Sequence, residues 1–298
     1  LDGDGWLDLY VANDTTANFL FRNKGAEGQP FVFEELGALA GVAGNADGGY
    51  QAGMGVSGGD LDGDGLIDLF VTNFFDEGTT AYLNLGHGQF ADRSASVGIL
   101  AVSRPILGFG LIAANGHVND YAPYVPYRMP GQVLLGDGRG KLKDVTRTSG
   151  EVWTRPRLGR GLVAGDLDRD GGLDFLVVDL GRPLALARNQ TDRTRPDAPR
   201  RNWVELVLKG DGVETPRDPI GAVVTLTTNQ GVQVVPLLGG GSYLSAPSSH
   251  LHLGLGTASA VNTLEIRWPS GQVERYEVTD WPINQSWRVE QGRGRLVD

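Results

Sequence analysis

The sequence lacks cysteine, and several other residue types are scarce. Disulfides, thiolate zinc sites and thiol catalysis are therefore excluded together. Only four histidines and two methionines occur among the 298 residues. No apolar run approaches the length of about 20 residues that a membrane-spanning helix needs. No signal peptide is visible, but the opening letters LDGDGWLDLY look like the middle of a motif, so we expect further sequence upstream.

Basic residues are also in the minority, and the acidic excess narrows the possible partners. The net charge is −10, which argues against binding to the phosphates of nucleic acids. Glycine is abundant instead, with 45 residues and no collagen-like period. Together with many short alternating apolar runs, this composition indicates an all-β chain of short strands and tight turns.

An acidic loop followed by an apolar strand occurs three times along the chain. The copies are LDGDGWLDLYVAN (1–13), GGDLDGDGLIDLFVTN (58–73) and GDLDRDGGLDFLVVDL (165–180). A second strand-like element follows each copy, and a further one at Gln132 marks a unit in which Gly110 replaces the last aspartate. Each of these four units is too small to bury its own apolar face. We therefore predict propeller blades that stack on their neighbours, with a β-sandwich as the alternative.

The composition changes after the repeats. Residues 191–202 are polar, rich in arginine and interrupted by proline, which is typical of a linker. Beyond them, short alternating runs broken by Gly, Pro and Asn predict a second all-β domain. The expected division is 1–190 for the repeats, 191–202 for the linker and 203–298 for the C-terminal domain.

The acidic loops follow the pattern D-x-D-x-D-G-x-x-D, in which a curled loop brings alternate side chains together. The predicted metal ligands are Asp60, Asp62, Asp64, the carbonyl of Leu66 and Asp68 in one loop; Asp166, Asp168, Asp170, the carbonyl of Gly172 and Asp174 in another; and Asp2, Asp4, the carbonyl of Trp6 and Asp8 in the first. Such oxygen-only ligation favours Ca²⁺ over zinc or copper. An EF-hand is excluded, because valines occupy the twelfth position and a strand follows the loop. The alternative is a set of Asp-Gly turns that merely join strands.

Catalytic and cofactor-binding residues cannot be assigned. The stretch around Ser57 matches G-x-S-x-G, but no helix follows it as a nucleophile elbow requires. The segment GDGRGKL (136–142) fails the phosphate-loop pattern and predicts a hairpin turn. His250 and His252 share one face of a strand, a spacing that could ligate a metal, but no third ligand is evident and we expect packing or a hydrogen bond. His117 is expected to stabilise a turn, and the alternative is a functional role at the propeller rim. The adjoining insertion NDYAPYVPYRMP (119–130) suits contact with carbohydrate or protein, or else packs over its own blade.

Longer motifs resemble a known family. GMGVSGGDLDGDGLIDLFVTN, AANGHV and GRGLVAGDLDRDGGLDFLVVDL resemble FG-GAP/VCBS repeats, which form the blades of integrin-alpha-type propellers. GGGSYLSAPSSHLHLGLG, LEIRWPSGQVERY and NQSWRV resemble the ASPIC/UnbV domain. Together they are similar to the cartilage acidic protein family of bacterial type. The resemblance implies an all-β, calcium-binding, secreted or periplasmic protein: here a partial β-propeller of about four blade units, followed by a small C-terminal β domain.

These observations favour a calcium-dependent extracellular binding or adhesion module, with calcium stabilising the blades and an unidentified protein or carbohydrate as ligand. A glycan-acting lyase or hydrolase and a purely structural domain are the alternatives. An enzyme should carry an acid and base pair away from the calcium loops, and no such pair can be placed. The residues therefore favour a role without catalysis.

Overall fold

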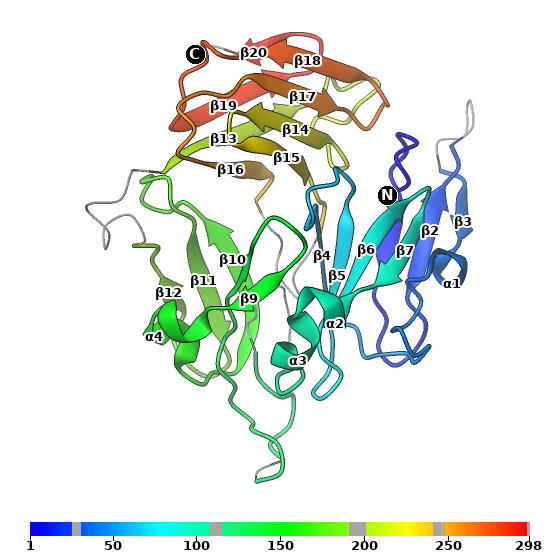
Figure 1. Ribbon diagram of the computed structural model, residues 1–298, viewed down its shortest axis with the longest axis vertical. Helices are drawn as coiled ribbons and strands as arrows, with labels where there is room; N and C mark the ends of the chain where they lie inside the picture. The colour runs from blue at the N-terminus through cyan, green and yellow to red at the C-terminus, as the bar shows by residue number, and fades with distance from the viewer. Residues whose placement is uncertain are drawn as a thin grey trace. The chain divides into compact units, whose positions relative to one another are not determined.

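The computed structural model describes residues 1–25, 31–107, 115–121, 123–190, 201–240, 246 and 248–296 (Figure 1). These residues form several small sheets, almost all of them antiparallel. The longest α-helix among them has five residues, so none could cross a membrane. The Gly110 position, most of the predicted linker and residues 241–245 lie outside the described ranges.

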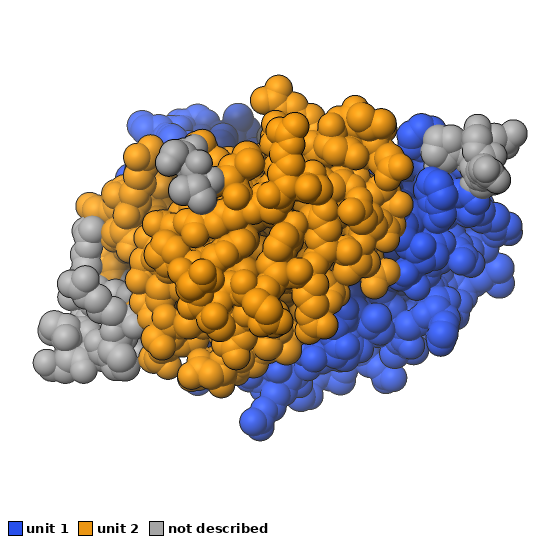
Figure 2. Space-filling view, turned by 90° about the horizontal axis from the view of Figure 1, so that it is seen from above, with its two compact units in different colours: residues 1–163, 176–187, 240–246 blue, residues 164–175, 188–239, 247–298 orange. Residues whose placement is uncertain are grey.

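The chain divides into two compact units, coloured separately in Figure 2. Unit 1 contains residues 1–163, 176–187 and 240–246, and unit 2 contains residues 164–175, 188–239 and 247–298. The division does not follow the order of the chain, because residues 164–175 lie within a repeat and yet cluster with the C-terminal part. That segment includes one of the predicted metal loops.

Each repeat forms a small sheet. The sheets are β1 (Leu9–Val11), β2 (Phe19–Asn23) and β3 (Phe33–Glu35); β4 (Gly55–Gly59), β5 (Asp68–Thr72), β6 (Thr80–Gly86) and β7 (Gln89–Asp92); β8 (Leu134–Gly136) and β9 (Leu142–Asp144); and β10 (Gly159–Gly165), β11 (Asp174–Asp179) and β12 (Ala185–Ala187), each in that spatial order. The hairpin predicted for residues 136–142 is confirmed by the pairing of β8 with β9.

Single helical turns occur between the sheets. They are α1 (Gly37–Ala40), α2 (Ser94–Val97), α3 (Ile99–Ser103), the 3-10 turn η1 (Thr146–Thr148) and α4 (Glu151–Thr154). Left-handed glycines end α1 and α2, at Gly41 with φ 81° and Gly98 with φ 89°. Glycine adopts this conformation without strain, so the chain can reverse directly after one turn of helix.

The repeat cores lie between neighbouring sheets. Leu69 and Val71 of β5 are buried together with Leu20 of β2. Phe70, which points to the other face of β5, is buried in a cluster that Leu134 of β8 joins. Because successive side chains of a strand alternate between faces, one strand serves two cores. A single repeat could not bury either face alone.

Unit 2 contains two four-stranded sheets. Their orders are β16 (His250–Gly256), β13 (Asn202–Lys209), β19 (Gln285–Glu290) and β20 (Gly294–Leu296); and β15 (Gly231–Pro236), β14 (Val223–Thr228), β17 (Thr263–Arg267) and β18 (Val273–Glu277). β13 and β19 run parallel, although 75 residues separate the start of β19 from the end of β13 (285 − 209 − 1).

The two sheets share one core. Leu206 of β13 and Trp287 of β19 are fully buried with Leu226 of β14 and Ile266 of β17. Buried and half-buried residues alternate strictly along β14, as expected for a strand with one face in the core. Unit 2 is therefore a β-sandwich with its own apolar interior, unlike the individual repeats.

Candidate metal centres

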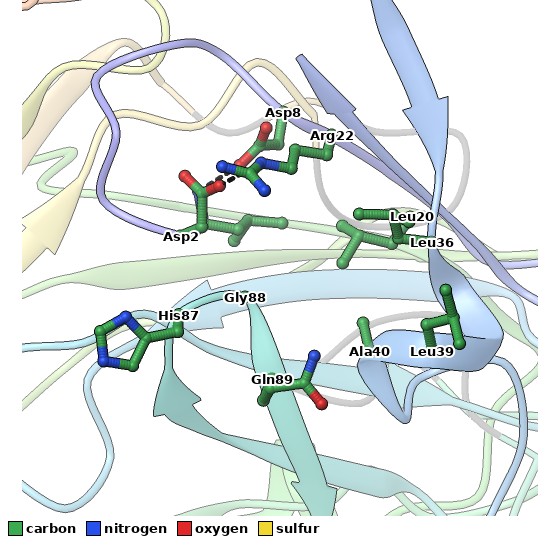
Figure 3. Close-up of a pocket in the computed structure, with 11 residues that line it drawn as sticks. Asp2, Asp8, Leu20, Arg22, Leu36, Leu39, Ala40, His87, Gly88 and Gln89 are labelled. Atoms are coloured by element: carbon green, nitrogen blue, oxygen red, sulfur yellow. Dashed lines mark hydrogen bonds and ion pairs between the residues drawn. The ribbon is translucent and has the colours of Figure 1, made fainter. Parts of the chain in front are cut away.

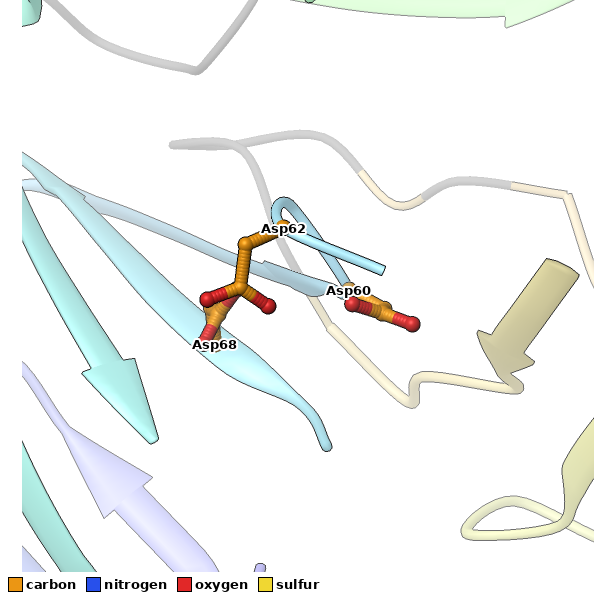
Figure 4. A group of neighbouring side chains, drawn as sticks. All are labelled: Asp60, Asp62 and Asp68. Carbon is orange, nitrogen blue, oxygen red and sulfur yellow. The ribbon is translucent and has the colours of Figure 1, made fainter. Parts of the chain in front are cut away.

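The loop between β4 and β5, residues 60–68, gathers three carboxylates. Oxygens of Asp60, Asp62 and Asp68 lie within 4.8 Å of one another, and Asp62 and Asp68 point toward each other in Figure 4. Asp68 begins β5, and its carboxylate accepts hydrogen bonds from the backbone N–H groups of Leu61 (2.9 Å) and Asn84 (2.8 Å). The strand thus positions one ligand, and the loop brings the others to it.

Two glycines give this loop its curl. Gly63 and Gly65 have φ angles of 81° and 89°, which glycine adopts without steric cost. Their N–H groups donate to the two carboxylate oxygens of Asp60 at 2.8 and 3.0 Å. Asp64 is not part of the close group, and its Oδ1 accepts the N–H of Leu66 at 2.8 Å.

The electrostatics of the loop suit a bound cation. Burial, reinforced by the neighbouring carboxylates, raises the pKa of Asp68 to about 6. Burial and the adjacent Asp64 also raise the pKa of Asp62. In the part of the chain that the structure describes, no lysine or arginine forms an ion pair with an aspartate of this loop. An oxygen-only donor set with uncompensated negative charge fits a hard divalent cation.

The loop between β10 and β11, residues 166–174, repeats this geometry. Oxygens of Asp166, Asp168 and Asp174 lie within 4.8 Å of one another. Asp174 accepts the N–H of Asn189 at 2.8 Å, as Asp68 accepts that of Asn84. Unlike the first triad, this one has a protein cation beside it, because the guanidinium of Arg188 pairs with Asp168.

The loop near the N-terminus, residues 2–8, is arranged differently. The Nε of Arg22 lies 2.5 Å from Asp2, and its Nη2 lies 3.6 Å from Asp4. Asp8 accepts the N–H of Asn23 at 2.9 Å. Figure 3 shows Asp2, Asp8 and Arg22 together at the edge of a cavity of about 190 Å³. The guanidinium of Arg22 thus lies beside two of these carboxylates.

The eleven predicted aspartate ligands accordingly differ in their arrangement, and Asp2, Asp4 and Asp8 make the contacts just described. Six aspartates are brought together as two triads, whereas Asp64 and Asp170 make turn hydrogen bonds instead. The three predicted backbone ligands, the carbonyls of Leu66, Gly172 and Trp6, stay predictions.

The 166–174 loop lies against the sandwich within unit 2. A Cβ added at Gly171 would lie 2.0 Å from Nε1 of Trp203, so the indole packs directly on this glycine. His252 stacks on Trp203 with ring centroids 5.4 Å apart. Burial lowers the pKa of His252, while the nearby Asp166 opposes that shift. His252 therefore packs against Trp203, one of the two roles expected from the sequence.

His117 and the 119–130 insertion lie in unit 1. His117 is buried, and its Nδ1 bonds with the backbone of Asn119, consistent with the expected turn-stabilising role. It contacts the rings of Phe74 and Tyr121 edge-on. The side chain of Tyr124 in the insertion is 90% exposed. The insertion thus combines an anchored base with an aromatic side chain open to solvent.

Sequence reasoning missed the arginines beside the loops. Arg22 and Arg188 each immediately precede the asparagine whose N–H donates to the last loop aspartate. Alignment of the repeats on these asparagines would have placed both arginines at one position, with Leu83 as their counterpart. The signal was present, but it lies 14 residues after the last aspartate in two loops (22 − 8 and 188 − 174) and 15 residues after it in the third (83 − 68).

Comparison with known proteins finds a family match near each end of the chain. The model of the FG-GAP-like repeat matches residues 1–71, and the model named ASPIC and UnbV matches residues 212–296. Cartilage acidic protein 1 from Xenopus tropicalis is 25% identical over 295 residues, covering 93% of this chain. The chain spans 42% of the length of that relative. It therefore carries an FG-GAP-like repeat and an ASPIC and UnbV domain, and it is a distant homologue of cartilage acidic protein 1.

A solved structure with a weaker likeness belongs to a candidate cell adhesion protein from Bacteroides uniformis. It is 12% identical, covers 58% of this chain and 83% of its own, and superposes with a TM-score of 0.21. A likeness at this level supports no assignment of fold or function. FG-GAP-like repeats imply propeller-type blades, in keeping with the small antiparallel sheets of unit 1.

Proposed function

We propose that this chain is part of an extracellular or periplasmic binding module whose propeller-type blades are stabilised by calcium. The observation that carries the proposal is the Asp60–Asp62–Asp68 triad, which gathers negative charge with no ion pair to a lysine or arginine among the described residues. The homology to an FG-GAP-like repeat protein supports the same assignment. Ca²⁺ is the expected ion because the donors are all oxygens and Ca²⁺, unlike Mg²⁺, does not demand a tight octahedron.

Calcium would act on the fold through β5 and the loop that precedes it. Asp68 belongs to the strand, whereas Asp60 and Asp62 belong to the loop. An ion shared by these carboxylates would tie the loop to the sheet and remove the repulsion between the acids. Binding of this kind stabilises the folded state by about 2.7 kcal/mol when the free ion exceeds its Kd by a factor of about 100.

The binding surface is proposed to include the 119–130 insertion. Tyr121 and Tyr124 are 51% and 90% exposed, respectively. Aromatic side chains contribute large contact areas at protein and carbohydrate interfaces. Loops fixed to a rigid scaffold commonly carry such contacts. The proposed ligand is accordingly a protein or a glycan.

Calorimetry on the metal-stripped chain tests the calcium proposal. We expect Ca²⁺ to bind with measurable heat and to raise the thermal midpoint above that in chelator. Asp62→Asn should abolish binding at its loop. Asp47→Asn is the matched control, because this exposed turn aspartate carries the same charge change. Absence of both heat and midpoint shift in the parent chain would refute the proposal.

Screening against protein and glycan arrays tests the binding role. We expect a retained ligand whose signal decreases after Tyr124→Ala, since this exposed ring would lose its contact area. The same screen in chelator should lose signal if the blades need calcium to hold the insertion. A chain that retains nothing on either array would leave only the structural alternative.

A further inference from the structure

The residue before a shared asparagine differs between the repeats, and this difference affects the proposed metal sites. The N–H groups of Asn23, Asn84 and Asn189 donate to the last aspartate of their loops at 2.9, 2.8 and 2.8 Å. This shared bond fixes the register between repeats, so the residue immediately before each asparagine is equivalent. These residues are Arg22, Leu83 and Arg188.

The side chains at this position have different partners in the three repeats. Arg22 and Arg188 pair with Asp2 and Asp168, which are themselves equivalent members of the loop pattern. Leu83 instead packs beside the apolar cluster that contains Phe70. Two loops therefore have an arginine at this position, and the 60–68 loop has a leucine there.

We propose that Arg188 is a resident counter-cation that competes with the metal ion at the 166–174 loop. This inference rests on the proposed calcium function. While the guanidinium pairs with Asp168, that carboxylate cannot ligate an ion freely. The positive charge also repels a divalent cation held by the same triad. The Asp166 triad therefore binds metal more weakly than the Asp60 triad, and its loop is held together in part by the arginine.

Replacement of Arg188 should strengthen metal binding at the 166–174 loop. Arg188 is partly exposed, with 42% of its side chain accessible, so replacement should not disturb a core. Arg188→Gln removes the charge, and Arg188→Leu introduces the residue that the 60–68 repeat has at the equivalent position, Leu83. Arg182→Gln is the control, because Arg182 is exposed on the turn that follows β11 and loses the same charge. We expect both Arg188 variants to bind metal about tenfold more tightly at the 166–174 loop.

Trp203 makes this loop separately observable in the full chain. Its indole packs on Gly171, so it can sensitise luminescence from Tb³⁺, a common calcium substitute, bound within the loop. The part of the Tb³⁺ signal that disappears in Trp203→Phe belongs to this loop. Titration of that signal, and its displacement by Ca²⁺, gives the affinity for each variant, while calorimetry follows the 60–68 loop.

The outcomes separate the two proposals. Tighter binding in both Arg188 variants, with Arg182→Gln unchanged, supports competition by the arginine. Unchanged or weaker binding after Arg188→Gln, while the 60–68 loop still binds Ca²⁺, overturns the inference and leaves the proposed function intact. If neither loop binds metal in any variant, both proposals fail.

Discussion

The loops at residues 60–68 and 166–174 can be compared residue by residue. Both gather their first, second and last aspartates, and both fix the last one through the N–H of an asparagine on a neighbouring segment. Their surroundings differ. The first loop lies beside the β8–β9 turn, where the N–H of Gly140 donates to Leu61 at 3.3 Å. The second lies beside Trp203 and His252 of the sandwich.

The loop motif sets the backbone geometry, whereas neighbouring residues set the charge balance. The spacing of aspartates and glycines is sufficient to curl the backbone, so the local geometry recurs. Charge balance is set from outside, by leucine in one repeat and arginine in the other. Equal motifs therefore need not be equal metal sites.

The largest loss of stability is expected when a glycine of the 166–174 loop is replaced. Gly171 has φ 90°, and an added Cβ would lie 2.0 Å from the Trp203 ring. Gly171→Ala should cost about 2 kcal/mol or more, from left-handed strain and the displaced indole. Gly63→Ala in the first loop should cost about 1 kcal/mol, because its φ is 81° and the nearest atom lies 3.6 Å away.

Chemical denaturation in chelator, followed by tryptophan fluorescence, measures both glycine variants. Equal losses would show that the indole yields freely and that the sandwich does not constrain the loop.

A change of pH is expected to have an intermediate effect on stability, through Asp68 of the 60–68 loop. The folded pKa of Asp68 is about 6, compared with an ordinary value of 3.8. Between these values the folded state binds more protons than the unfolded state, so the metal-free chain should lose stability as pH rises through this window. Above about pH 6 the contribution of Asp68 should stay constant.

Urea denaturation at several pH values in chelator measures this slope. Asp68→Asn should flatten it between pH 4 and 6, whatever its effect on absolute stability. A variant with the slope of the parent chain would show that another group is responsible.

The smallest effect on stability is expected at a position that is glycine in the 60–68 loop and arginine in the 166–174 loop. Arg169 has φ 58°, whereas its counterpart in the first loop is Gly63. Arg169→Gly should relieve left-handed strain and stabilise the chain by up to about 1 kcal/mol. Arg182→Gly is the control, where added backbone freedom should be neutral or destabilising. Thermal unfolding distinguishes them, and an equal change in both variants would contradict the explanation.

Much of the strand content could be predicted locally. The apolar runs after each acidic loop form β1, β5 and β11, and the alternating runs of the C-terminal part form β13, β14 and β17. Two sandwich strands, β18 and β20, were missed. The exposed face of β18 carries Glu and Arg, and β20 has only three residues, so neither shows a clear apolar pattern.

The candidate sites were also predictable in part. Six of the predicted aspartates gather into two triads because their spacing acts within one loop. The pairing of Arg188 with Asp168 was not anticipated, because it joins residues 20 positions apart (188 − 168). The contact of Gly171 with Trp203 was missed for the same reason, since nothing in the loop specifies its neighbour.

By itself, the sequence determined the elements that depend on short-range chemistry: the acidic turns, the alternating strands and their repetition. Only the tertiary structure decided where these elements find partners. The cores of the repeats form between sheets, the strands β13 and β19 pair in parallel across a long separation, and residues 164–175 cluster with the sandwich. The physical reason is that strand faces and loop carboxylates are satisfied by distant groups, and a local pattern shows the need for a partner without specifying which one meets it.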